Sequence, residues 1–205
     1  MSAPERRSRF GGASLPARGG AAQGDAVTIA ECPATLIQVT ARKGRQDALA
    51  AATLKELALA LPAPGASALA GDCSALWLQP GGWLIQAPAN DGNALVRRLA
   101  AALDGIAAVV DQSHGRCVLR LSGQQARAVL AKLCRLDLHP RSFAVGASAT
   151  TLVGHVACTM RLVDETPAFD LIVGASYATW LLEELVEAAD GFGWQLTRAG
   201  AAQPA

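Results

Sequence analysis

The sequence predicts an α+β protein built from two halves of ferredoxin-like, split βαβ order. Three observations support this fold class. In the first half, strand-like and helix-like patterns follow one another as β-α-β-β-α-β, the order of a split βαβ unit. The second half follows a similar element order, without residue-level similarity between the halves. Between them, residues 111–140 contain the clearest change from a period of two to a helical period.

Short apolar runs separated by turn signals define the first half. Pro62 ends an Ala- and Leu-rich helix, because proline cannot continue one. Pro80-Gly81-Gly82 joins two strands as a hairpin, and Asn90 or Asp91 caps the second helix. The predicted elements are strands over 36–40, 75–79, 83–87 and 106–110, with helices over 44–61 and from 90 or 91 to 103.

The second half begins with an alternating strand. Cys117, Leu119 and Leu121 alternate with Val118, Arg120 and Ser122, which is typical of a half-buried strand. The next helix carries Ala126, Val129, Leu130 and Leu133 on one face, and Ser122 and Gln125 have capping-box spacing. The remaining elements are strands over 149–153, 156–163 and 169–173 and a helix over 177–189, with Leu181 and Leu185 as its buried pair.

The 205 residues are enough for one domain, and 51% of them are hydrophobic, which allows a sizeable core. Residues 1–26 are rich in Gly, Ala, Arg and Pro, so we predict a disordered N-terminal tail. We predict a single α+β module over 27–196 and a loose C-terminal tail over 197–205.

Composition and spacing argue against several classes of function. A net charge of +1 and an aromatic content of 4% disfavour a nucleic-acid surface. No apolar run reaches the roughly 18 residues of a membrane span. Five scattered cysteines indicate reduced, mostly buried thiols in a cytoplasmic protein, and three histidines lack ligand spacing for a metal. No dinucleotide or P-loop glycine motif follows a strand, so no cofactor-binding residue is predicted.

Three motifs in order carry a resemblance to a known family. Asp111-x-Ser113-His114, then Leu121-Ser122-Gly123 opening a helix, then Leu136-Asp137-Leu138 resemble the folate-binding half of the glycine-cleavage aminomethyltransferase superfamily. One branch of this superfamily, the gamma subunit of heterotetrameric sarcosine oxidase, is similar over a longer segment. This segment has the sequence D-Q-S-H-G-R-C-V-L-R-L-S-G, followed by L-D-L-H-P-R. The similarity extends from about Ala34 to Ala189 and implies a folate-binding domain of intertwined α+β subdomains.

The resemblance also implies which residues such chemistry needs. Folate-dependent aminomethyltransferases use a carboxylate whose position falls near residues 155–157 by rough matching. Residues 139–163 contain no Asp or Glu, so no side chain there can act as that acid. The chain is too short for the second domain of the full-length transferases, and the K-G-C-x-x-G-Q-E motif of iron–sulfur maturation factors is missing. We therefore predict no catalytic residue in this chain.

The candidate binding or interface residues are Asp111, Ser113, His114, Arg116, Trp77, Trp83 and Arg141. The first four form either a polar junction with an Asx-type turn at Asp111 or a patch facing a ligand or another subunit. The two tryptophans flank the predicted hairpin and either pack on their own core or lie at an interface. Arg141 is either solvated or takes part in docking.

The resemblance implies a subunit of an enzyme complex. Sarcosine oxidase demethylates sarcosine oxidatively to glycine, produces hydrogen peroxide and passes the one-carbon unit to tetrahydrofolate. This chain would be a non-catalytic module docking on the large subunit, with alpha, beta and delta subunits as partners. FAD, FMN, NAD and tetrahydrofolate would be bound by those subunits. The alternatives are a stand-alone folate or small-ligand-binding one-carbon protein and an α+β adaptor of an unrelated complex.

Overall fold

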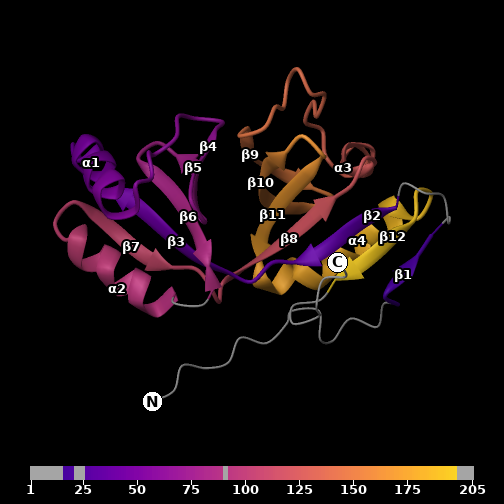
Figure 1. Ribbon diagram of the computed structural model, residues 1–205, viewed down its shortest axis with the longest axis horizontal. Coiled ribbons are helices and arrows are strands. Elements are labelled where there is room, and N and C mark those ends of the chain that lie inside the picture. Colours follow the sequence, from indigo (N-terminus) through magenta and orange to yellow (C-terminus); the bar gives the residue numbers. More distant parts are fainter. Residues whose placement is uncertain (1–15, 21–25, 90–91, 198–205) are drawn as a thin grey trace, which may run out of the picture.

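Two β-sheets form the centre of the fold in the computed structural model, which describes residues 16–20, 26–89 and 92–197 (Figure 1). The five-stranded sheet has the order β4-β5-β6-β3-β7, and the seven-stranded sheet has the order β1-β12-β2-β8-β11-β10-β9. The strands are β1 (Arg18–Gly19), β2 (Val27–Glu31), β3 (Ala34–Ala41), β4 (Ser67–Ala70), β5 (Cys73–Gln79), β6 (Gly82–Pro88), β7 (Ala107–Asp111), β8 (Arg116–Ser122), β9 (Ser148–Val153), β10 (Val156–Asp164), β11 (Ala168–Gly174) and β12 (Trp194–Thr197). The helices are α1 (Gln46–Leu57), α2 (Gly92–Ala102), α3 (Ala126–Leu133), α4 (Ala178–Ala189) and the short 3₁₀ helix η2 (Ala175–Tyr177).

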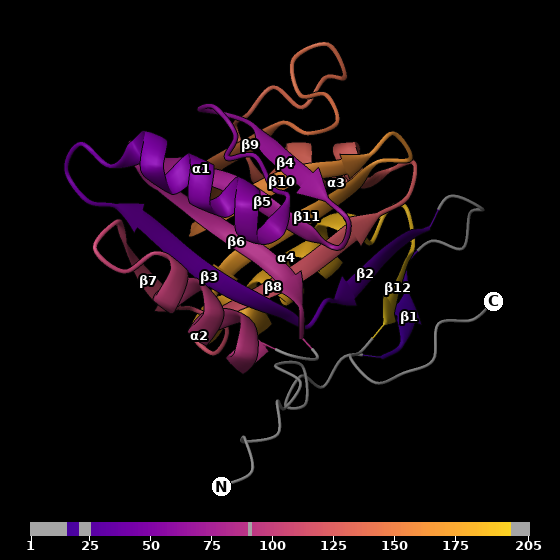
Figure 2. The ribbon, with the colours of Figure 1, turned by 60° about the vertical axis from the view of Figure 1, so that its left-hand side comes forward.

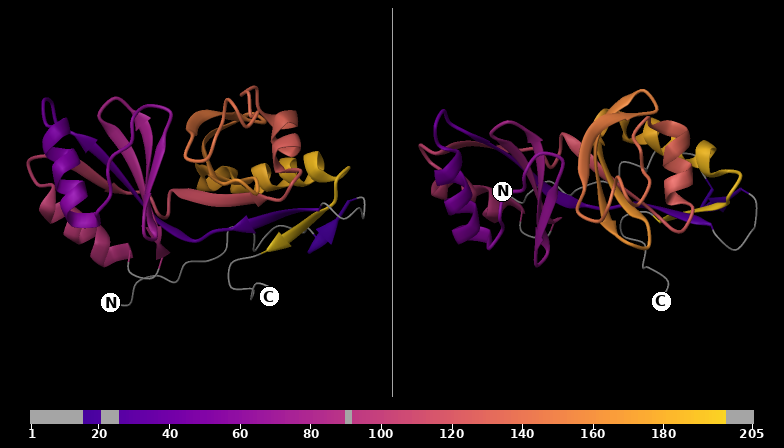
Figure 3. Two further views of the ribbon diagram at one scale, coloured as in Figure 1. Left: turned by 45° about the horizontal axis from the view of Figure 1, so that its top comes forward. Right: turned by 90° about the horizontal axis from the view of Figure 1, so that it is seen from above.

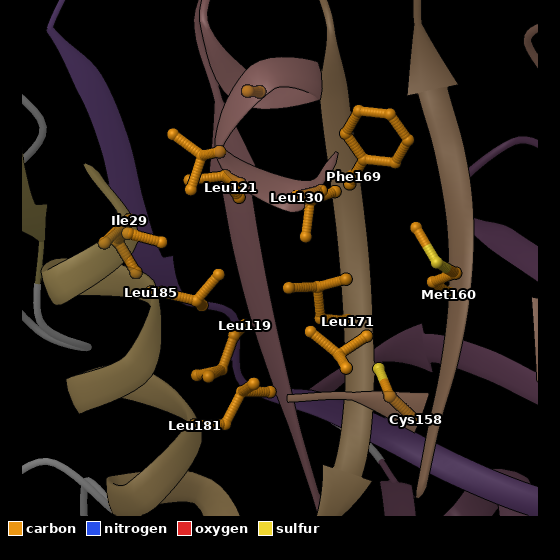
Figure 4. Close-up of a cluster of buried hydrophobic side chains, with 14 of the residues drawn as sticks. Ile29, Leu119, Leu121, Leu130, Cys158, Met160, Phe169, Leu171, Leu181 and Leu185 are labelled. Atoms are coloured by element: carbon orange, nitrogen blue, oxygen red, sulfur yellow. The ribbon is translucent and has the colours of Figure 1, made fainter. Parts of the chain in front are cut away.

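The elements are stacked in four layers, with the sheets inside and the helices outside (Figure 3). Ile37, Leu49 and Leu99 belong to a core between the five-stranded sheet and helices α1 and α2. A larger core joins the seven-stranded sheet to α3 and α4 (Figure 4). Leu119 of β8, Leu171 of β11 and Leu181 of α4 are fully buried in it. Each sheet therefore buries its outer face under its own pair of helices.

The five-stranded sheet confirms the predicted split βαβ order of the first half. Its strands β7, β3, β6 and β5 lie side by side and all pair antiparallel, and α1 and α2 connect them on one face. The strand β4 extends this unit at the β5 edge and was not predicted. The α+β class predicted from the sequence is confirmed.

The second half has the same order with one insertion. Strands β12, β8, β11 and β10 follow the split βαβ order, but β2 lies between β12 and β8, parallel to the first and antiparallel to the second. Because β2 precedes the entire first half in sequence, the two halves are interleaved. Figure 2 shows β2, β12 and β1 side by side at one margin of the fold.

The predicted tails lie mostly outside the described residues. Within the predicted disordered tail, Arg18 and Gly19 form β1 and pair with β12, so the prediction is wrong for these two residues. At the other end, Thr197 is the last residue of β12. The sequence patterns missed β1, β2 and β12 because each is short and depends on partners far away in the chain.

Two predicted helix boundaries are wrong. Helix α1 ends at Leu57 rather than near Pro62, because Ala58 adopts a left-handed conformation with φ 53° and turns the fully buried Leu59 back into the core. The predicted capping box does not form, since Ser122 still belongs to β8 and α3 begins at Ala126 without a side-chain cap. Between them Gly123 takes φ +119°, which separates the strand from the helix. The predicted cap at Asn90 or Asp91 lies outside the described residues.

Candidate functional site

The inner faces of the two sheets form the layer in which polar side chains gather. Along β8, Cys117, Leu119 and Leu121 face the helices, so Arg116, Val118 and Arg120 face the opposite sheet. Val118 belongs to an apolar cluster with Leu36, Leu76 and Leu84 of the five-stranded sheet and Ile172 of β11. Arg116 and Arg120 lie at either end of this apolar middle. The sheet interface therefore has two polar ends, each containing an arginine from the same strand.

The turn between β7 and β8 connects the two sheets at the first polar end. The backbone N–H of Ser113 donates to Asp111 Oδ1 at 2.8 Å, which confirms the predicted Asx-type turn. Ser113 Oγ accepts a hydrogen bond from the backbone N–H of Leu36 at 3.0 Å, and Ser113 is buried. The backbone N–H of Ala175 donates to the carbonyl of Gly115 at 2.9 Å. The turn is thus fixed to β3 on one side and to the end of β11 on the other, while His114 is exposed.

A cavity of about 410 Å³ opens beside this turn, between the sheets, and we refer to it as the junction cavity. Its polar side chains come from both sheets and from the turn, namely Gln38, Gln79, Gln112, Arg116, Thr150 and Thr159. Leu78, Ile172 and Tyr177 contribute apolar surface. Among the described residues that line it, Arg116 is the only charged one. Burial lowers the pKa of Arg116, and no carboxylate of the described chain lies within ion-pair distance of it.

The second polar end contains a buried ionic cluster of Arg120, Arg161 and Asp170, which we call the arginine cluster. Asp170 on β11 is fully buried. Its carboxylate accepts hydrogen bonds from Arg120 at 2.7 and 3.1 Å and from Arg161 at 2.8 and 3.1 Å. Burial by itself raises the pKa of Asp170, but the two guanidinium groups outweigh it and hold the pKa below its ordinary value. A carboxylate held ionised in this way is unsuited to proton transfer near neutral pH.

The arginine cluster was not predicted from the sequence. One signal was available, because Asp170 stands within the otherwise apolar run Ala168–Val173 of a strand. Its partners, however, come from the neighbouring strands β8 and β10, and no local spacing connects them. A second cavity of about 330 Å³ adjoins the cluster, and Gln86 Oε1 in its lining is buried without a hydrogen-bond partner in the described chain.

The two predicted tryptophans belong to a different face. Trp77 and Trp83 pair across the β5–β6 hairpin. Trp83 packs against the core under α1 and α2, and its indole N–H donates to the carbonyl of Pro62 at 2.9 Å. Its contacts are therefore those of a residue that packs on its own core. The structure does not bring these side chains together with the β7–β8 turn.

Arg141 also lies apart from the junction cavity. It is exposed on the loop after α3, where its backbone N–H donates to His139 Nδ1 at 3.2 Å. The neighbouring Asp137 accepts from the backbone N–H of His139 at 3.0 Å and shapes the same turn.

The seven candidate residues thus lie in different places. Asp111, Ser113, His114 and Arg116 share one turn, and of the seven Arg116 alone reaches the junction cavity.

Residues 155–157, where the resemblance led us to expect the position of an aminomethyltransferase acid, lie at the β9–β10 turn. His155 is exposed there and packs against Trp180, with ring centroids 6.3 Å apart. Val156 and Ala157 line the junction cavity. The described lining residues contain no carboxylate, so the junction cavity does not fit acid-dependent folate chemistry.

The cysteines, possible metal ligands and helix lengths of the described residues were compared with the expectations from the sequence. The five cysteines, all within the described residues, form no disulfide bond, and Cys117, Cys134 and Cys158 are buried. Burial raises the pKa of Cys158 to about 12. No cluster of three or more His, Cys, Asp or Glu side chains is arranged to hold a metal there. No described helix has both the length and the apolar character needed to cross a membrane.

The interleaved double-sheet fold is shared with a glycine cleavage system aminomethyltransferase. The glycine cleavage system aminomethyltransferase T from Bartonella henselae superposes with a TM-score of 0.63 at 18% identity, over 84% of this chain and 48% of that chain. This likeness shows the fold.

Comparison of the sequence with known protein families identifies the family of this chain. Residues 42–190 match the model of the sarcosine oxidase, gamma subunit family, and the chain belongs to this family. It is 36% identical over 149 residues to the sarcosine oxidase subunit gamma of Corynebacterium sp. (strain U-96), spanning 71% of this chain and 69% of that relative. A second relative, from Corynebacterium sp. (strain P-1), is 36% identical over 118 residues, and the match spans only 57% of its length. The resemblance drawn from the D-Q-S-H and L-S-G motifs is confirmed.

A solved structure matches nearly the whole chain. A chain of the heterotetrameric sarcosine oxidase from Corynebacterium sp. U-96, in complex with pyrrole 2-carboxylate, superposes with a TM-score of 0.78 at 32% identity. The match covers 98% of this chain and 99% of that chain.

Proposed function

We propose that this chain is the gamma subunit of a heterotetrameric sarcosine oxidase. The observation that carries the proposal is the end-to-end match to one chain of a heterotetrameric sarcosine oxidase, with 98% and 99% of the two chains covered. The complex would demethylate sarcosine oxidatively, yielding glycine, hydrogen peroxide and a one-carbon unit on tetrahydrofolate. Alpha, beta and delta subunits would be its partners, and they would bind the FAD, FMN, NAD and tetrahydrofolate.

Within this complex, the chain would have an architectural role and dock on the large subunit. Two features of the sheet interface support this role. The junction cavity presents no described carboxylate, and the buried carboxylate of Asp170 is occupied by two arginines. The apolar cluster of Val118, Ile172 and Leu36 packs the two sheets together, and these features together support an architectural role.

Co-expression tests the proposal. A tagged copy of this chain is produced with alpha, beta and delta candidates, purified, and assayed for flavin absorbance and sarcosine-dependent peroxide. We expect the tag to retrieve yellow subunits, and we expect the complex to fall apart when this chain is omitted. A parallel purification with an unrelated tagged protein controls for non-specific capture. A chain that purifies alone as a stable monomer, with active oxidase forming without it, contradicts the proposal.

The junction cavity supports a second candidate function, that of a stand-alone folate or small-ligand-binding protein. Its volume of about 410 Å³ falls within the few hundred cubic ångströms typical of small-molecule sites. Calorimetric titration of the isolated chain with tetrahydrofolate tests this candidate. Saturable binding that Arg116→Met abolishes supports it, and the absence of heat at any accessible concentration excludes it.

A further inference from the structure

Arg116 differs from the other arginines of the sheet interface, because no acid among the described residues pairs with it. Arg120 and Arg161 lie on the same inner face of the seven-stranded sheet and share Asp170. Arg116 is half-buried in the junction cavity, whose described lining contains no Asp or Glu. Taking a cation out of water without a partner disfavours its charged form, and burial does lower its pKa. No carboxylate among the described residues compensates for this cost.

The surroundings of Arg116 have the character of a protein interface. Tyr177 lines the junction cavity and is 55% exposed. Leu152 is 57% exposed and pairs with Ala157, another lining residue, across β9 and β10. Directly opposite residues of an antiparallel pair lie on the same face, so Leu152 stands beside the cavity mouth. Large exposed apolar side chains around a partly desolvated arginine are the arrangement found at the energetic centres of interfaces.

The strand next to this mouth is an edge. β9 is the last strand of the seven-stranded sheet, and its sequence Thr150-Thr151-Leu152-Val153 is rich in β-branched and apolar residues. Natural edge strands of this kind are usually protected by charges, prolines or a covering segment. The chain itself covers the start of this edge, since the backbone N–H of Ser148 donates to the carbonyl of Gly65 at 2.9 Å. The remaining stretch Thr150–Val153 carries no charge and no proline, which agrees with a covering partner there.

We propose that the junction cavity is a docking socket in which Arg116 pairs with an aspartate or glutamate of another subunit, while Leu152 and Tyr177 pack against apolar side chains flanking that acid. The inference rests on the proposed function, because the partner is a subunit of the same complex. Charge complementarity defines the occupant: the socket presents one guanidinium and several neutral amides, so a single carboxylate neutralises it.

Binding of Arg116 variants to the other subunits tests the socket. The alpha, beta and delta subunits are each purified separately, and the affinity of added gamma chain for them is measured for wild type, Arg116→Met and Arg116→Lys. Removing one partner of a desolvated charge pair lowers affinity by about thirty-fold or more, so we expect such a loss for Arg116→Met. Lysine keeps the charge but not the fork geometry, so Arg116→Lys should lose less. Arg97→Met, at an exposed arginine on α2, is the matched control and should bind within about two-fold of wild type.

The stability of the isolated chain separates docking from a role within the fold. An arginine that serves a partner leaves its own chain no less stable when replaced, so the urea midpoint of Arg116→Met should equal or exceed that of wild type. A lower midpoint would overturn the inference, as would wild-type affinity of Arg116→Met for the other subunits. In the second case wild-type chain still assembles, and the proposed function stands. If wild-type chain fails to bind the other subunits at all, the proposed function falls and the socket with it. Binding of succinate to the isolated chain through Arg116, with assembly unaffected by Arg116→Met, would also overturn it.

Discussion

Asp170 is the acid on which the arginine cluster depends, and its replacement by asparagine is the sharpest test of the fold. Asp170→Asn keeps the size of the side chain but removes its charge. Arg120 and Arg161 then lie against each other without a counterion, and four hydrogen bonds to a carboxylate are lost or weakened. Breaking a buried ion pair by removing one partner costs about 3–5 kcal/mol.

The expected loss can be divided between the two arginines. The side chain of Arg161 is 9% exposed and that of Arg120 is 36% exposed. Water screens the more exposed partner, so Arg161 should account for most of the loss. A typical domain is stable by about 5–15 kcal/mol, so Asp170→Asn removes a large share of the stability.

Urea unfolding followed by tryptophan fluorescence measures this loss. The matched control removes the charges together, as Arg120→Met, Asp170→Leu and Arg161→Met in one chain. Replacement of a whole buried ionic cluster by apolar side chains is often neutral or stabilising, so the triple variant should be far more stable than Asp170→Asn. The reasoning is refuted if Asp170→Asn loses less than about 1 kcal/mol, or if the triple variant is no more stable than the single one.

Three further predictions follow from the described residues. The pKa of Asp170 in the folded chain lies below that of an unfolded aspartate, so ionised Asp170 contributes fully to the free energy of unfolding above about pH 4. This contribution is lost as the pH falls through the folded-state pKa. The urea midpoint should therefore drop more between pH 7 and pH 3 in wild type than in Asp170→Asn. Gly123→Ala should lower stability by about 1–3 kcal/mol, since the new Cβ would lie 3.3 Å from Val27 Cα at a φ of +119°. Gly44→Ala is the control and should lose less stability, because its Cβ would have open space around it. Thermal melting of the two variants measures the difference. Cys158, whose pKa burial raises to about 12, should resist a thiol reagent in the folded chain and react only on unfolding, as mass spectrometry of labelled peptides would detect.

Sequence patterns predicted the parts of this fold that depend on local periodicity. The alternation in β8 assigned Cys117, Leu119 and Leu121 to one face, and that face is the one covered by α3 and α4. The patterns failed where pairing is long-range, since nothing in residues 27–31 indicates that they lie between β12 and β8. A capping box was predicted from spacing alone, but Gly123 extended the strand-to-helix connection and moved the helix start out of reach of Ser122.

The candidate site was predictable to a similar extent. The D-x-S-H string marked the correct turn, because the Asx geometry at Asp111 follows from local chain chemistry. Arg116 was marked with it, although only the structure places its side chain between the sheets. The role of Asp170 was not predicted, because its ion pairs are formed with arginines that β8 and β10 bring to it.

The two polar ends of the sheet interface differ in where their charge is balanced. Arg120 is balanced inside the chain by Asp170, so its contribution belongs to folding. Arg116, four residues earlier on the same face of β8, meets no acid in the described chain. If its acid comes from another subunit, folding of the isolated chain bears a cost that assembly offsets. Substitutions at the two positions should then separate cleanly: those at Asp170 lower stability and assembly together, whereas those at Arg116 lower assembly while stability is unchanged or higher.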